Sequence, residues 1–140
     1  MSILSSTGAG IQHFIDKWFK EYVITNGKPI VVKDENGKFV CVDVIGDVII
    51  KSYRASAFPE YIKFGHVSGS FECSYSQLES MRGFPQQVDR DFTCYNCSNI
   101  FSIEGLPNVI GRDCIIRFCG KQFTENEIRA KCNVKRNVFC

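Results

Sequence analysis

The chain has 140 residues, of which 44% are hydrophobic and 13% aromatic, a composition that excludes a disordered chain and suffices for one folded domain. A formal net charge of only +2 excludes the concentrated positive field of a dedicated nucleic-acid-binding protein, so we expect no nucleic-acid partner. The sequence has no apolar run of about 18 residues and no signal-peptide pattern at its start, so we expect a cytoplasmic protein with no membrane partner.

The first predicted element is an amphipathic helix. Ser5, Ser6 and Thr7 are suitable N-cap residues, and Asn26-Gly27 ends the helical pattern. Between them, apolar residues recur every three or four positions: Ile11, Phe14, Ile15, Trp18, Phe19, Tyr22 and Val23. We expect this stripe to cover the open N-terminal end of the fold. The alternative is a helix lying on a membrane surface, which the acidic residues on its polar face disfavour.

Two strands are predicted next, at residues 29–33 and 38–45. The segment between them contains Asn36-Gly37, which is typical of a β-hairpin turn. The helix and the hairpin together form a predicted N-terminal cap, residues 1–45.

Residues 46–120 repeat one short pattern. Its copies start at Val44, Val67, Val88 and Ile110, with spacings of 23, 21 and 22 residues. Each copy has two apolar residues separated by one other, the period of a short strand with one buried face: Val48 and Ile50, Phe71 and Cys73, Phe92 and Cys94, Cys114 and Ile116. One copy cannot bury this face alone, so the pattern predicts stacked coils with a parallel sheet.

The clearest copy, residues 67–88, resembles the compact leucine-rich repeats in small proteins of large tailed (T-even-like) bacteriophages, with related repeats in other microbial and giant-virus proteins. Their consensus is approximately V-x-G-x-F-x-C-S-x-N-x-L-x-S-L-x-G-x-P. The chain departs from it at the asparagine position, which holds Ser76 and Cys97. The resemblance covers about residues 40–119 and implies a solenoid of about four coils whose exposed strand face binds a partner.

The C-terminal part is predicted to be helical. Thr124 followed by Glu127 is a capping-box pattern, and we expect a helix there that covers the last strand, with a short tail after it. The predicted fold class is α+β: a single domain, residues 1–140, in which a short leucine-rich-repeat-like solenoid lies between the N-terminal cap and a C-terminal helical cap and tail, residues 121–140.

The eight cysteines allow more than one interpretation. Cys94, Cys97, Cys114 and Cys119 have the spacing of a four-ligand zinc site. The repeat offers a simpler cause, because each of them falls on a strand-core or ladder position where a small apolar residue packs well. We prefer core packing, and keep a zinc-stabilised nucleic-acid-binding or regulatory module as the alternative and redox pairing as a third. Cys132 and Cys140 lie outside the repeat and are expected to be exposed.

The sequence holds no recognisable catalytic motif. Asp47, Asp91 and Asp113 occupy equivalent repeat positions, interrupted by Ser70. Such a column could bind Ca²⁺, but strand-start carboxylates more often accept hydrogen bonds from turn amides, which we prefer. We therefore expect neither an enzyme nor a cofactor.

The outward face of the repeat sheet is the predicted binding surface. Alternation places Ile49, Glu72, Thr93 and Ile115 in one outward column and Lys51, Ser74, Tyr95 and Arg117 in the next. The candidate partner-binding residues are Lys51, Glu72, Ser74, Thr93, Tyr95 and Arg117. Mixed charge, and a face that by alternation lacks stacked aromatic residues, favour a protein partner over nucleic acid. The predicted function is a non-catalytic protein–protein interaction module, resembling phage proteins that act on a host component in the host cytoplasm.

Overall fold

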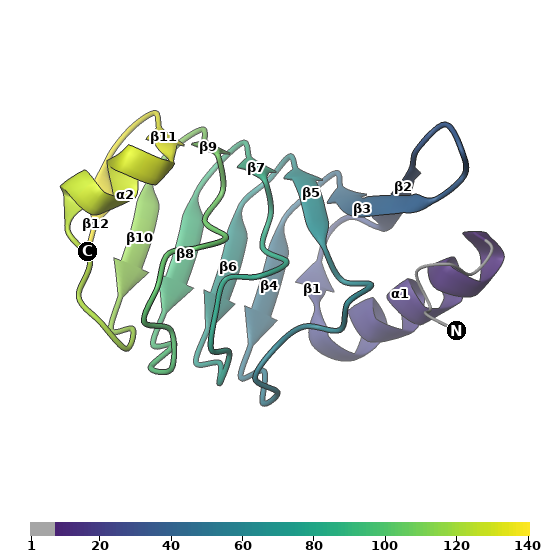
Figure 1. The fold of residues 1–140 in the computed structure, drawn as a ribbon, viewed down its shortest axis with the longest axis horizontal. Coiled ribbons are helices and arrows are strands. Elements are labelled where there is room, and N and C mark those ends of the chain that lie inside the picture. The colour runs from purple at the N-terminus through teal and green to yellow at the C-terminus, as the bar shows by residue number, and fades with distance from the viewer. Residues whose placement is uncertain (1–7) are drawn as a thin grey trace.

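The computed structural model describes residues 8–140, with side chains from Gly10 onward. The predicted N-cap residues Ser5, Ser6 and Thr7 lie outside this range. Within it the chain is a parallel β-solenoid of about four turns, with an N-terminal helix and an antiparallel start at one end and a C-terminal helix at the other (Figure 1). The predicted fold class is confirmed.

Each coil contributes one strand to each of two sheets. Sheet A has the order β1 (Ile24–Thr25), β4 (Val48–Lys51), β6 (Phe71–Ser74), β8 (Phe92–Tyr95), β10 (Cys114–Arg117), β12 (Val138–Phe139). Sheet B has the order β11 (Asn133–Val134), β9 (Val109–Ile110), β7 (Gln87–Val88), β5 (Phe64–Val67), β3 (Phe39–Val44), β2 (Pro29–Lys33). The pairs β1–β4 and β2–β3 are antiparallel, and the other pairs that the structure describes are parallel.

The register of sheet A is the one that the repeat spacing predicts. Phe71 lies opposite Val48 on one side and Phe92 on the other, and Phe92 lies opposite Cys114. The parallel part of sheet B was not predicted, because β7, β9 and β11 are two residues long, too short to show the alternation by which a strand is recognised.

A ladder of side-chain acceptors joins the coils at the corner between the two sheets. Each member accepts the backbone N–H of its equivalent in the following coil. The acceptor and donor pairs are Asn26–Asp47 (2.7 Å), Asp47–Ser70 (2.8 Å), Ser70–Asp91 (3.1 Å), Asp91–Asp113 (3.0 Å) and Asp113–Asn137 (3.0 Å). The preferred interpretation of the aspartate column, as acceptors for turn amides, is confirmed, and Ser70 does the same with its hydroxyl oxygen.

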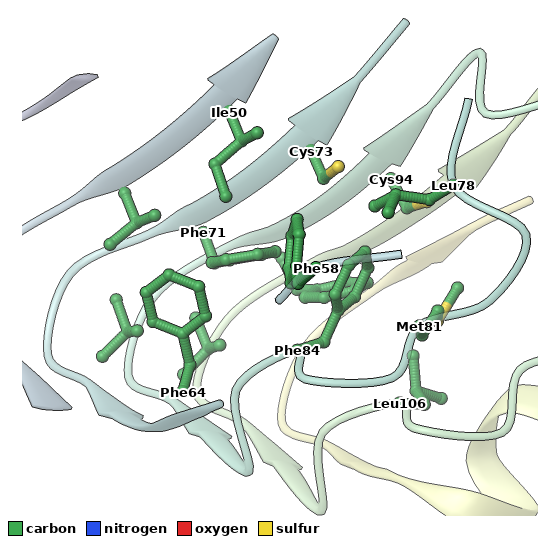
Figure 2. Packing of buried hydrophobic residues seen from close by; sticks show 14 of the residues in the cluster. Ile50, Phe58, Phe64, Phe71, Cys73, Leu78, Met81, Phe84, Cys94 and Leu106 are labelled. Atoms are coloured by element: carbon green, nitrogen blue, oxygen red, sulfur yellow. The ribbon is translucent and has the colours of Figure 1, made fainter. Parts of the chain in front are cut away.

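The core lies between the sheets and the loops that return from sheet A to sheet B (Figure 2). Phe71 and Phe92 stack in neighbouring coils with ring centroids 5.8 Å apart, and Phe84 from a returning loop lies 5.2 and 6.0 Å from them. The next returning loop needs Gly105, which has a φ of +96° and approaches so closely that a Cβ there would lie 2.6 Å from Met81 O. The returning loops are therefore stacked too closely at this point to admit any side chain in place of the glycine.

Helix α1 (Gly8–Tyr22) covers the open N-terminal end of the stack, as predicted (Figure 1). Trp18 contacts Phe58 and Tyr53, with ring centroids 5.2 and 5.7 Å away, and Phe19 contacts Phe64 at 5.7 Å. Phe14 lies at the edge of the stripe and is 42% exposed. The hairpin β2–β3 also forms as predicted, and β3 then pairs with β5 to begin sheet B.

Helix α2 (Glu125–Lys131) begins at the predicted capping box. The N–H of Glu127 donates to Thr124 Oγ1 (3.1 Å), and the N–H of Thr124 donates to Glu127 Oε1 (3.2 Å). The expected short tail after it is ordered, because β11 and β12 extend both sheets by one more strand. Arg129 holds this segment by donating to Val134 O (2.8 Å) and Arg136 O (2.6 Å).

Neither helix that the structure describes has the length and apolar character needed to cross a lipid bilayer.

Candidate functional site

The outward side of sheet A has the two predicted columns. The strand registers place Lys51, Ser74, Tyr95 and Arg117 in one row and Ile49, Glu72, Thr93 and Ile115 in the row beside it. Lys51 and Arg117 are exposed, and Tyr95, Glu72 and Thr93 are half-buried. These residues therefore share one face, as expected.

Ser74 does not fit the prediction of a partner-binding residue. It is only 2% exposed, because its small side chain lies between the longer Lys51 and Tyr95 of the neighbouring strands. Its hydroxyl donates to Glu72 Oε2 (3.0 Å). Ser74 thus orients Glu72 and offers little surface of its own.

Sequence alternation missed a row of aromatic side chains at the end of the sheet A strands. Tyr75 and Phe118 are 58% and 64% exposed, and Tyr95 lies between them with its ring centroid 5.8 Å from Tyr75 and 5.3 Å from Phe118. We call Tyr75, Tyr95 and Phe118 the aromatic row. The face was predicted to lack stacked aromatic residues; both ring contacts here are edge-to-face, and alternation did not reveal them.

Backbone conformation explains why alternation missed these residues. The residue that follows each of four sheet A strands has a positive φ of 54–57°: Ser52, Tyr75, Asn96 and Phe118. In this left-handed conformation the chain leaves the strand, so the period of two that assigns side chains to faces no longer holds. The available signal was that the two aromatics occur 43 residues apart, at the same place in the repeat.

The C-terminal end of the aromatic row also carries positive charge. The guanidinium carbon of Arg117 lies 5.8 Å from the ring centroid of Phe139 on β12, a cation–π contact. Next to Arg117 and Phe118 is an open hollow of about 420 Å³, which Cys119, Lys121 and Cys140 also line. Lys121 is already paired with Glu127, with Nζ 3.3 Å from Oε2, so Arg117 supplies the available charge.

The cysteines are mainly core residues, as preferred. Cys73, Cys94, Cys97 and Cys114 are fully buried, and burial raises the pKa of the Cys114 thiol to about 12. The expectation of an exposed thiol at Cys132 was wrong, because this residue, which joins α2 to β11, is only 3% exposed, and burial raises its pKa to about 11.

The four cysteines of the zinc alternative do not converge on one point. Cys94 contacts both Cys119, with the sulfurs 3.9 Å apart, and Cys97, whose Sγ also accepts a hydrogen bond from Ser76 Oγ (3.2 Å) in the coil before. Cys114 is instead near Cys132 and Cys140. Among residues 8–140, no group of three or more histidine, cysteine or acidic side chains is arranged to hold a metal ion.

The histidines belong to other surfaces. His66 lies in β5 of sheet B, and its Nε2 is 2.8 Å from Asp89 Oδ2. His13 lies on α1, with its ring centroid 5.8 Å from that of Phe14. Neither contributes to the sheet A face.

No protein-family model matches this chain, and neither the curated proteins nor the solved structures that were searched gave a significant match.

Proposed function

We propose that this chain is a non-catalytic protein-interaction module that binds a partner protein through the outward face of sheet A. The observation that carries the proposal is the aromatic row, in which Tyr75 and Phe118 present large apolar rings to solvent. Aromatic residues and arginine are the types enriched at interaction hot spots, and Arg117 and Phe139 extend the row with both.

The fold alone gives no reason for bulky rings at these two positions. A left-handed backbone disfavours residues with a Cβ, typically by about 1 kcal/mol or more, and asparagine tolerates it better. The chain does place Asn96 at one equivalent position. Tyr75 and Phe118 therefore occupy strained positions where a polar residue would serve the solenoid at least as well, which supports a role in binding.

Charge indicates the kind of partner. Lys51 and Arg117 are the exposed charges of the outer column, while the carboxylate of Glu72 is half-buried and accepts a hydrogen bond from Ser74. A partner segment that presents apolar side chains flanked by carboxylates would complement this arrangement. The resemblance to leucine-rich repeats of phage proteins supports the same class of function, with a host-cell protein as the partner.

The test is a comparison of captured proteins between two matched double variants. In Tyr75→Asn with Phe118→Asn, both rings are removed while the left-handed backbone is accommodated. The control, Gln86→Ala with Gln87→Ala, changes two exposed residues at the sheet B side. We expect a protein that wild type and the control retain from a lysate, and that the aromatic variant releases. Equal retention by all three chains would contradict the proposed surface.

A further inference from the structure

Two cysteines of neighbouring coils meet at the wall of the hollow beside Arg117. Cys119 lines the hollow and is partly exposed, whereas Cys94 lies behind it in the core. Their sulfurs are 3.9 Å apart. A disulfide needs about 2.05 Å, so the two sulfurs must move closer before a bond can form, and Cys119 lies at the open side of the pair.

We propose that Cys119 and Cys94 form a thiol–disulfide exchange site that takes a low-molecular-weight disulfide carrying carboxylates, such as oxidised glutathione. The hollow, about 420 Å³ in volume, is large enough to admit part of such a molecule. Arg117 supplies a cation for its carboxylates at the same wall.

The order of reaction follows from the surroundings of the two sulfurs. A hydrogen bond from the Cys94 thiol lowers the pKa of Cys119, against the opposing effect of burial. The pKa of Cys94 is raised by the same contact first, then by its contact with Cys97 and by burial.

In the first step, the Cys119 thiolate attacks one sulfur of the small disulfide. A Cys119–sulfur bond forms, the disulfide bond of the reagent breaks, and one small thiolate leaves and takes a proton from water. Cys119 then no longer carries the negative charge that kept Cys94 protonated. In the second step Cys94 loses its proton to solvent and attacks Cys119 Sγ, and the second small thiol leaves. The protein loses two electrons and the reagent gains them as two thiols.

The preceding coil contains a matched pair that should not react. Cys73 and Cys97 occupy the equivalent positions, with Cys97 Sγ 3.5 Å from Cys73 O, as Cys119 Sγ is 3.7 Å from Cys94 O. Both are fully buried, and the Ser76 hydroxyl lies 3.2 Å from Cys97 Sγ. A following coil covers this pair, whereas no coil within residues 8–140 covers Cys119, which is partly exposed, so exposure separates the two pairs.

The experiment uses the full reduced chain under native conditions. It is incubated with oxidised glutathione, the remaining thiols are blocked with N-ethylmaleimide after unfolding, and peptides are identified by mass spectrometry. We expect a peptide pair linked through Cys94 and Cys119, with Cys73 and Cys97 found blocked. A glutathione adduct confined to Cys140, or linkage through any other pair, would overturn the proposal.

Variants test the roles of the two sulfurs. Cys119→Ser should abolish the linkage, and Cys94→Ala should stop the reaction at a stable glutathione adduct on Cys119. A linkage that persists in Cys119→Ser would overturn the assignment. If Cys94→Ala fails to fold, native alkylation of the wild type decides: Cys119 must react at least ~10-fold faster than Cys97, and equal rates refute the proposal.

Discussion

Trp18 of α1 packs edge-on against Phe58 of the first coil, with ring centroids 5.2 Å apart and ring planes inclined at 75°. The contact closes the open end of the solenoid, because a terminal coil has no neighbour on one side to cover its apolar face. We expect Trp18→Ala to reduce the free energy of unfolding by about 3–5 kcal/mol, measured by urea denaturation.

Trp18→Phe supplies the control for this prediction. The indole Nε1 is buried and makes no hydrogen bond to any residue that the structure describes. Phenylalanine keeps most of the ring contacts and removes this unpaired donor, whose burial costs about 1–3 kcal/mol. The loss in Trp18→Phe should therefore be well below that in Trp18→Ala, and equal losses would show that the contacts of the six-membered ring matter little.

The corner ladder gives a second prediction. Asp91 Oδ1 accepts the N–H of Asp113 at 3.0 Å, so Asp91→Ala leaves a part-buried amide without its acceptor and should cost about 1–2 kcal/mol. Asp91→Ser should recover part of this loss, because Ser70 fulfils the same role in the coil before. Thermal unfolding of both variants checks the order, and a serine variant no more stable than the alanine variant would contradict it.

Periodicity explains what the sequence could predict. The helical stripe from Ile11 to Val23, the hairpin turn at Asn36-Gly37 and the coil register were all visible as regular spacing or local turn chemistry, and the structure bears them out. The ends of the ladder, Asn26 and Asn137, were missed although they continue the same spacing of 21–24 residues. They lie outside the repeat as it was delimited.

The candidate site was less predictable, because its decisive features depend on φ and on neighbour size. Alternation places a side chain on a face but does not say whether longer neighbours cover it, which is how Ser74 was misjudged. It also stops at the strand end, where the left-handed Tyr75 and Phe118 bring their rings beside Tyr95. Both features follow from tertiary structure and not from the period of the sequence.

The binding surface gives a third prediction. Tyr95→Ala with Arg117→Ala should weaken binding of the captured partner by at least ~2 kcal/mol, the scale of a hot-spot loss. The cost to stability should be small but measurable, about 0.5–1.5 kcal/mol, because the Tyr95 ring contacts both Tyr75 and Phe118. Calorimetry measures the partner affinity and urea denaturation measures the free energy of unfolding, so the two effects can be separated. Unchanged affinity with lowered stability would make the row a structural feature.

The last prediction concerns the pH dependence of Cys119. Its pKa lies below the usual value, chiefly because the Cys94 thiol donates to its sulfur, so a larger fraction is thiolate at a given pH than in an ordinary cysteine. Alkylation with iodoacetamide should therefore reach its half-maximal rate below about pH 8.5, the value of an unperturbed thiol.

Cys94→Ala removes the donor, so the midpoint should move upward, because burial, which raises the pKa of Cys119, is then no longer opposed by that contact. Cys140→Ala should leave the midpoint where it is in wild type. A midpoint that is the same in Cys94→Ala as in wild type would show that the two sulfurs are neighbours whose ionisations are not coupled. The alkylation rate of the unfolded chain, measured at each pH, corrects for the intrinsic reactivity of the reagent.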